Sequence, residues 1–368
     1  MESSDDAPSR LLTLPADLQQ EIFGYLSPID IEIFSFCSKS SFQVAKCVKK
    51  PQKIEMNIEL AKEGCVRISY PPQGRFLFSA FHKDKDNIVG SGKTYNQVVG
   101  KESGMFVMKD THNLTTYWND EIQGLLDFVK HLVEVFGIVL ISTVQTNSSY
   151  GKRQELTSPE HGDIQSAYNY RLLLDWLQKE YKGEVDELIF ETIDQTNNSE
   201  LIYLLDAGKI AKRRLDFYTY LSPNLDYQFN YDFRELKICS GNWIKFDNLV
   251  QLSHQVRSLN IFKSSFTSLC LNQFIKKWLK SGEDLKLKTL SLHFRGNDVD
   301  MEQVLSDIEH QKFEGKDHYF LRKEKSFIKK GWVIRRRIKN DKLIIPGEVH
   351  SPRSLMMYIA PFKKGRLA

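Results

Sequence analysis

The sequence contains few cysteines, and none of them lies at a metal-binding spacing. Five cysteines occur among 368 residues, and no two are separated by only two positions. Proteins built on disulfides or on zinc ribbons usually show several cysteines at short, repeated spacings. We therefore expect reduced thiols in a protein of the cytoplasm, the nucleus or both.

Long apolar runs and an excess of one charge are also missing. No stretch of 18 apolar residues occurs, so we expect no membrane span. The N-terminus, MESSDDAPSR, is acidic and polar, unlike a secretory or mitochondrial leader. The 51 basic and 47 acidic side chains leave a net charge of +4. That balance is too small to indicate a nucleic-acid partner by itself.

Catalytic motifs are absent as well. The GSGKT stretch at 90–94 lacks the glycine that a phosphate loop needs five positions before Gly92, where Asn87 stands, and we predict a polar loop over 83–95. The nine histidines are dispersed, and neither HExxH nor GxSxG occurs. We predict no catalytic residue, no metal ligand and no cofactor. A hydrolase on an unfamiliar scaffold stays open as an alternative.

The composition is that of a globular protein with a large core. Apolar residues make up 41% of the chain, charged residues 27%, and 23 of the residues are phenylalanine. The length suits one small module joined to a larger body.

Leu14–Ser41 is the most informative segment. Pro15 suits the first position of a helix, and Leu18, Ile22 and Leu26 follow at helical spacing. Ser27-Pro28 can start a second helix, and five of the next eight residues are apolar. About 40 residues rarely make a self-sufficient core. Either the rest of the chain covers this surface or another chain does.

The same segment resembles the F-box, the helical module by which substrate receptors dock on the Skp adaptor of SCF ubiquitin ligases. The matching positions are Leu14-Pro15, Leu18, Glu21-Ile22-Phe23, Tyr25-Leu26, Pro28, Asp30-Ile31, Phe34 and Cys37-Ser38-Lys39. Ser41 departs from the usual Trp and Ser38 from the usual Cys. The resemblance implies a Skp-type adaptor and, through it, a cullin as partners. The adaptor-facing residues that it implies are Leu14, Pro15, Leu18, Ile22, Leu26, Ile31 and Phe34.

The rest of the chain changes from strands to alternating strands and helices. A β-rich segment is expected over 51–118, with strands at 54–60, 66–70, 75–81 and 105–109 and a short one at 115–118. Helices are expected at 119–136 and 163–181 on either side of a strand at 138–144. Then Leu-x-apolar segments begin at Leu188, Leu215, Leu236, Leu259 and Leu290, which lie 27, 21, 23 and 31 residues apart. These intervals lie near those of leucine-rich repeats.

This pattern predicts an α+β or α/β fold, with stacked strand–helix units behind the helical module and a closing hairpin at 331–347. An ordinary α/β sheet of another topology is the alternative, and both place the leucines in the core. In the stacked arrangement, alternate strand residues point outward, among them Glu187, Arg214, Asp216 and Ser291. The candidate substrate face consists of Tyr218, Lys237, Asn260, Phe262 and His293.

Residues 229–294 are similar to the type 2 F-box-associated domain of the nematode F-box protein family. The resemblance is carried by Trp243, by the spacing from Thr267 to Asn272 to Trp278, and by Gly282. It implies recruitment of a protein substrate of unknown identity. The predicted domains are a tail at 1–10, an F-box at 11–50, a β-rich segment at 51–118 and a leucine-rich-repeat-like domain at 119–368.

Two basic stretches, 209–214 and 335–342, support an alternative function. They could meet phosphate backbones in a non-catalytic nucleic-acid-binding or protein-interaction module. Charged residues also protect exposed hairpin edges, and no nucleic-acid module accompanies them, so we favour that explanation. The predicted function is the substrate-recognition subunit of an SCF-type E3 ubiquitin ligase, without a catalytic site of its own.

Overall fold

The chain folds into two compact units, Met1–Glu187 and Leu188–Ala368. The structure is a computed structural model. It describes residues 10–50, 54–60, 64–71, 74–82, 93–99, 102–108, 112–147, 164–191, 198–218, 225–281, 285–295, 299–321, 326–336, 341–346 and 354–361. Among these residues, no helix combines the length and the apolar character that crossing a membrane would require.

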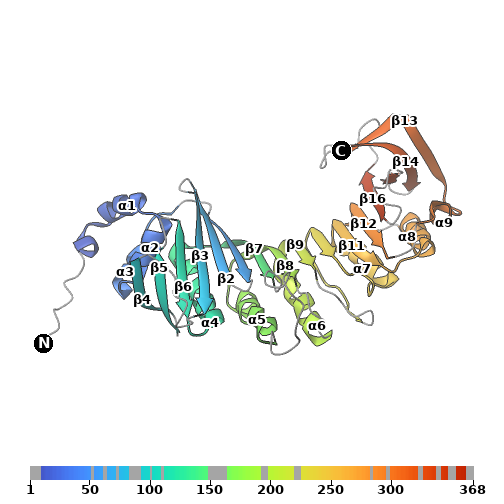
Figure 1. Ribbon diagram of the computed structural model, residues 1–368. Helices are drawn as coiled ribbons and strands as arrows, with labels where there is room; N and C mark the ends of the chain where they lie inside the picture. Colours follow the sequence, from blue (N-terminus) through green and yellow to red (C-terminus); the bar gives the residue numbers. More distant parts are fainter. Residues whose placement is uncertain are drawn as a thin grey trace. The chain divides into compact units, whose positions relative to one another are not determined.

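The first unit opens with the three predicted helices (Figure 1). A short 3-10 turn, η1 (Arg10–Thr13), precedes α1 (Ala16–Tyr25), α2 (Pro28–Ser35) and α3 (Lys39–Cys47). Ser27 and Asp30 form a capping box, in which each side chain accepts the other's backbone N–H at 3.1 Å. Ser38 caps α3 by accepting the N–H of Ser41 at 3.0 Å. These caps satisfy helix amides locally, which is why the sequence alone predicts the helix starts.

A mixed sheet follows in the same unit. Its strands are β1 (Glu55–Leu60), β2 (Gly64–Tyr70), β3 (Gly74–His82), β4 (Lys93–Val99), β5 (Glu102–Met108), β6 (Asn113–Trp118) and β7 (Leu140–Asn147). They lie in the order β7-β1-β2-β3-β6-β5-β4, with β1/β7 and β3/β6 parallel and the other pairs antiparallel. The loop predicted over 83–95 is wrong at its end, because Lys93 begins β4 and pairs with Met108. Gly90–Gly92 of the GSGKT stretch lie outside the described residues.

Two helices complete this unit, α4 (Glu121–Phe136) and α5 (Ile164–Lys179). Asp120 caps α4 by accepting the N–H groups of Ile122 and Gln123, as predicted from the sequence. The apolar face of α4, from Leu125 to Phe136, lies in the core. Gly137 ends the helix with φ of +60°, a left-handed conformation that glycine adopts without strain.

The second unit contains parallel strands that neighbour one another in chain order. Its elements are β8 (Glu184–Glu191, which begins at the end of the first unit), α6 (Asn198–Ala207), η2 (Gly208–Ile210), β9 (Ala211–Phe217), β10 (Glu235–Ile238), α7 (Phe246–Gln255), β11 (Ser258–Ser264), α8 (Ser268–Lys280) and β12 (Thr289–Phe294). Leu236 lies opposite both Leu215 and Leu259, and Leu259 lies opposite Leu290. All four leucines are at most 1% exposed.

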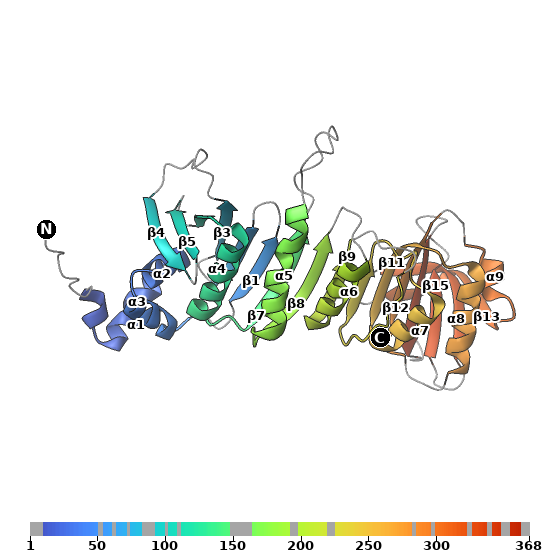
Figure 2. The same cartoon turned by 90° about the horizontal axis from the view of Figure 1, so that it is seen from below.

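These buried leucines lie under α6, α7 and α8, which cover one face of the strands (Figure 2). The mixed α/β fold class is confirmed. The specific likeness to leucine-rich repeats stays a prediction, as do the domain limits at 50, 118 and 119.

A C-terminal antiparallel segment ends the second unit. It contains α9 (Met301–Leu305), β13 (His310–Leu321), β14 (Ser326–Arg336), β15 (Asp341–Pro346) and β16 (Ser354–Pro361). The predicted hairpin at 331–347 is confirmed as the β14–β15 pair. The sequence did not predict β13 or β16. β16 returns to pair with β12, with Met356 opposite Ser291.

Candidate functional site: two interaction surfaces

The first surface is an apolar stripe on α1. Leu18, Ile22 and Tyr25 are 44%, 37% and 85% exposed, and they recur at i, i+4 and i+7. This spacing places them on one side of the helix. Of the other predicted adaptor-facing residues, Pro15 is exposed and Leu14, Leu26 and Phe34 are half-buried. Phe34 packs edge-on against Phe23, with ring centroids 5.0 Å apart.

Ile31 requires a correction to the predicted set. Its side chain is 0% exposed, because α2 turns that side of the helix into the first unit. A partner chain has no surface of Ile31 to contact in this structure. We therefore leave Ile31 out of the docking surface proposed below and add Tyr25, which the sequence analysis did not select. Tyr25 carries a helical signal that was present in the sequence, since it lies seven residues after Leu18.

The opposite side of the helical module is covered by α4. Phe36 stacks on His131 with centroids 4.4 Å apart, and Ser35 Oγ lies 2.7 Å from His131 Nε2. Lys46 forms an ion pair with Glu134 at 3.1 Å. The sequence left open whether the rest of the chain or another chain covers the apolar surface of these helices, and the answer differs between the helices. The chain covers α2 and α3 itself, whereas the stripe on α1 is exposed.

The second surface lies on the face of the parallel strands opposite their helices. Lys237 Nζ donates a hydrogen bond to Tyr218 Oη at 2.5 Å and lies 5.5 Å from the centre of the Phe262 ring. Phe262 in turn stacks on His293, with centroids 4.2 Å apart and ring planes at 3°. Asn260 is opposite Lys237 in the strand register. The structure therefore brings the predicted face together as one row of contacts across β9 to β12.

Charge on this face is mixed. The Arg214 guanidinium forms two hydrogen bonds to the Asp216 carboxylate, which is 1% exposed. Burial opposes the charge of Lys237, but its hydrogen bond to Tyr218 and the nearby Asp216 outweigh that effect, and its pKa is raised. Burial lowers the pKa of His293, so its imidazole is neutral at pH 7. The face presents one ammonium among aromatic rings, which suits cation–π contacts and peptide groups.

Two of the strand residues predicted to point outward are not available to a partner, and one residue that was not predicted belongs to the same face. Asp216 and Ser291 point outward but are 1% and 5% exposed. Met356 is 37% exposed and continues the face, because β16 pairs with β12. No signal near Met356 in the sequence indicates this, since the pairing joins strands more than 50 residues apart.

Two family models match the chain. The F-box domain matches residues 11–53, and an F-box-associated domain matches residues 221–292. The chain therefore contains an F-box domain followed by an F-box-associated domain. No curated protein and no solved structure matches the chain. The matched segments contain the helices α1 to α3 at the start and, in the second unit, the run from β10 to α8 with most of β12. The resemblances noted in the sequence are therefore confirmed as domain matches.

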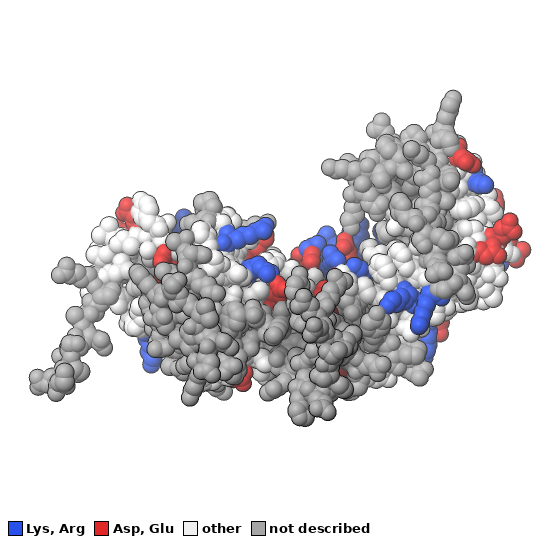
Figure 3. Space-filling model, viewed as in Figure 1, with Lys and Arg blue, Asp and Glu red and all other residues white. Residues whose placement is uncertain are grey.

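The two basic stretches of the chain are partly neutralised or buried. Lys209 pairs with Asp206 at 2.6 Å, and Arg214 pairs with Asp216. Arg336 is 2% exposed, lies 5.2 Å from the Trp278 ring and donates to the Ser281 carbonyl at 3.2 Å. The prediction that Arg336 belongs to an exposed basic stretch is therefore wrong. Residues 337–340 lie outside the described residues. In the view of Figure 3, the basic side chains are interspersed with acidic ones.

The described part of the chain offers no cluster of three or more His, Cys, Asp or Glu side chains placed to hold a metal ion. All five cysteines are free thiols, and Cys37 and Cys47 are exposed.

A buried acid lies where the F-box meets α4. Glu32 is 0% exposed, and its carboxylate oxygens have no hydrogen-bond partner among the described residues. Its Oε1 lies 3.6 Å from His131 Nε2. Burial raises the pKa of Glu32 well above its usual value. Burial, with Lys46 nearby, lowers the pKa of His131 to about 4, so this contact is not an ion pair at pH 7.

Replacing Glu32 with Gln is expected to stabilise the protein at pH 8. An acid whose pKa is raised on folding favours the folded state below its unfolded pKa, and that contribution is lost as the pH rises through the folded pKa. Gln removes this loss, so the melting temperature should rise by a few degrees, where about 1 kcal/mol corresponds to ~2–4 °C. Thermal unfolding at pH 4.5 and pH 8 measures the change in melting temperature, and the increase should be smaller at pH 4.5. Glu134→Gln, at an exposed ion pair, should change little. A lower melting temperature for Glu32→Gln at pH 8 would contradict this.

Proposed function

We propose that this protein is the substrate-recognition subunit of an SCF-type E3 ubiquitin ligase. Its F-box binds a Skp-type adaptor, and through that adaptor a cullin, by the exposed stripe of Leu18, Ile22 and Tyr25 with Leu14 and Pro15 beside it. The observation that carries the proposal is this stripe, which stays exposed while α4 packs against α2 and α3, in a segment that matches the F-box model. An exposed apolar stripe of this kind is typical of a protein-interaction surface.

The second unit recruits a protein substrate in this proposal, and ubiquitin transfer is carried out by other subunits. The row formed by Tyr218, Lys237, Asn260, Phe262 and His293 is the substrate face. Support comes from its position in and beside the F-box-associated match, and from its exposed mixture of a cation with aromatic rings. Aromatic and cationic side chains contribute most of the binding energy in many interfaces.

Substitution of Lys237 by Glu together with Phe262 by Ala tests the substrate face. Both side chains are half-buried on the open face, so we expect the fold to persist while bound substrates are lost. Affinity purification of the full chain, followed by mass spectrometry, should show adaptor and cullin retained and a set of other proteins reduced at least tenfold. A tenfold loss corresponds to about 1.4 kcal/mol, well within the range for interface anchors.

The matched control is Lys288→Glu with Leu269→Ala. Lys288 is exposed and Leu269 is 52% exposed, and neither belongs to the open face. This control should retain every co-purifying protein. Equal losses in the two double variants would refute the assignment of the face. Point substitutions are preferable to deletion of residues 1–50, because that deletion would uncover the α4 side chains that contact Phe36 and Ser35.

A further inference from the structure

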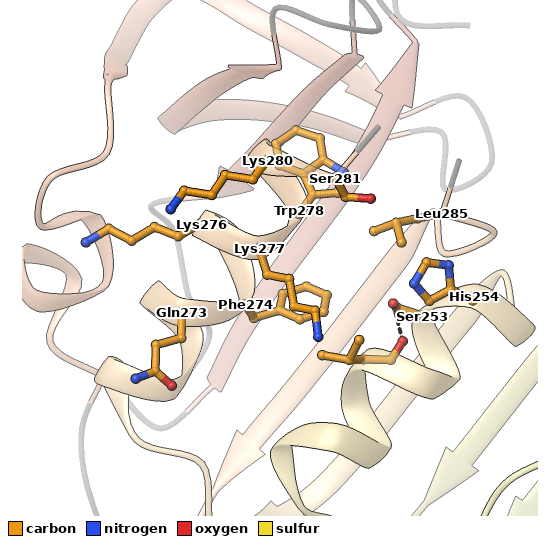
Figure 4. A pocket seen from close by; sticks show the side chains of 11 residues that line it. Ser253, His254, Gln273, Phe274, Lys276, Lys277, Trp278, Lys280, Ser281 and Leu285 are labelled. Atoms are coloured by element: carbon orange, nitrogen blue, oxygen red, sulfur yellow. Dashed lines mark hydrogen bonds between the residues drawn. The ribbon is translucent and has the colours of Figure 1, made fainter. Parts of the chain in front are cut away.

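A pocket of about 590 Å³ lies between α7 and α8, on the helix side of the second unit (Figure 4). Phe274 and Trp278 of α8 and Leu285, which follows it, line its floor, and His254 of α7 lies at its edge. The floor side chains are at most 8% exposed, so they are held in place by the core. The volume falls within the ~300–1,000 Å³ typical of ligand-binding clefts.

Lysine side chains supply the positive charge of this pocket. Lys276, Lys277 and Lys280 line it, and among the residues that the structure describes no Asp or Glu belongs to the lining. Lys276 forms an ion pair with Asp307 at 3.4 Å. Lys277 and Lys280 form no ion pair with any residue that the structure describes, and both are exposed. In Figure 4, Lys277 extends from α8 into the space between the two helices, toward Ser253 and His254.

The side chains that line the pocket favour one kind of anion. α7 ends at Gln255 and α8 at Lys280, so the pocket lies at two helix C-termini, where the negative end of the helix dipole opposes any anion and the lysines must supply the attraction. Phosphate groups favour helix N-termini and the forked donors of arginine, and the pocket lining has neither. Lysine side chains carry a single charge on a long apolar stem, which suits a carboxylate placed beside an apolar side chain.

We propose that the α7–α8 pocket docks an acidic peptide segment of a partner protein. An apolar side chain of the segment rests on Phe274, Trp278 and Leu285, and flanking Asp or Glu side chains pair with Lys277 and Lys280. This surface is separate from the open strand face and does not depend on adaptor docking. The proposal goes beyond the proposed function because it assigns an acidic peptide as the ligand of another surface of the second unit.

Panning a random peptide library on the full chain tests the proposal. We expect enriched peptides to carry Asp or Glu on both sides of an aromatic or aliphatic residue, and their binding to weaken as salt is added. Lys277→Glu with Lys280→Glu should reduce their affinity at least tenfold in fluorescence anisotropy. Lys277→Gln with Lys280→Gln, which removes charge without reversing it at a helix C-terminus, should reduce it by a smaller factor.

The matched control, Lys182→Glu with Lys212→Glu, makes the same change in net charge at exposed lysines outside the pocket and should bind normally. The melting temperature of each variant reports whether the second unit is folded, and adaptor capture measured in parallel distinguishes a failed pocket from a failed adaptor surface. The proposal is overturned if no acidic motif is enriched, or if the pocket and control variants lose affinity equally. Tighter binding of the same peptides with phosphoserine in place of Asp or Glu would overturn the assignment to carboxylates.

Discussion

Substituting Leu18 and Ile22 of α1 by glutamate is expected to abolish capture of a Skp-type adaptor. Both side chains are already exposed, at 44% and 37%, so their replacement removes little from the core of the chain. In the proposed complex they face apolar groups, and a charge buried there without a partner costs several kcal/mol. We expect the affinity to fall at least 100-fold, which corresponds to about 2.7 kcal/mol. Surface plasmon resonance with the purified adaptor measures the loss.

Leu269→Glu provides a matched control for this change. Leu269 is 52% exposed on α8, so the control places one glutamate at an exposed leucine outside the F-box, where the tested variant places two within it. It should bind the adaptor with unchanged affinity. Unchanged melting temperatures for both variants would show that the helices persist. Wild-type affinity in the Leu18→Glu, Ile22→Glu variant would remove the α1 stripe from the docking surface and, with it, the basis of the proposed function.

Replacing Gly124 by alanine is expected to destabilise the first unit strongly. A Cβ built at Gly124 would lie 2.2 Å from a ring atom of Trp118, well inside contact distance. Trp118 is 0% exposed, and its indole N–H donates to Thr116 Oγ1 at 2.9 Å, so the ring has no free space to enter. Overpacking of this kind costs about 1–3 kcal/mol or more, which exceeds the ~1 kcal/mol that alanine gains over glycine in a helix.

Gly24→Ala is the matched comparison, because it is the same substitution inside another helix. No atom lies within 4 Å of a Cβ built at Gly24, which is exposed on α1. Alanine should therefore stabilise the chain there by up to about 1 kcal/mol. Thermal unfolding of both variants should show shifts of opposite sign. A stabilising Gly124→Ala substitution would mean that α4 does not lie as closely on β6 as the structure places it.

The two glycines show which effects on stability follow from local rules and which depend on tertiary contacts. From the sequence alone, both are helix-interior glycines with the same expected cost. Only the packing of Trp118 against α4 separates them. The same division applies to Ile31 and Phe34, which both belong to the predicted adaptor-facing set. Ile31 is fully buried whereas Phe34 keeps some exposed surface, because α2 packs one of its sides into the first unit.

Local signals were sufficient for most of the elements. The capping residues Ser27 and Asp120 act on amides at most three positions away, so the starts of two helices could be predicted. The Leu-x-apolar segments alternate within one strand, which indicated both the buried leucines and the outward row containing Lys237 and Phe262. The order of the F-box and the F-box-associated domain was also evident from the residues that carry the two resemblances.

The sequence by itself therefore determined the helices of the F-box, most strands and the residues that share a strand face, because each depends on neighbours a few positions away. The tertiary structure alone decided which side of the F-box stays exposed, that Arg336 is buried against Trp278, and that β16 extends the open face. These features join residues far apart in the chain: Ser35 and His131, for example, are separated by 96 positions. No periodicity or cap encodes such a pairing, since it results from how complete surfaces pack.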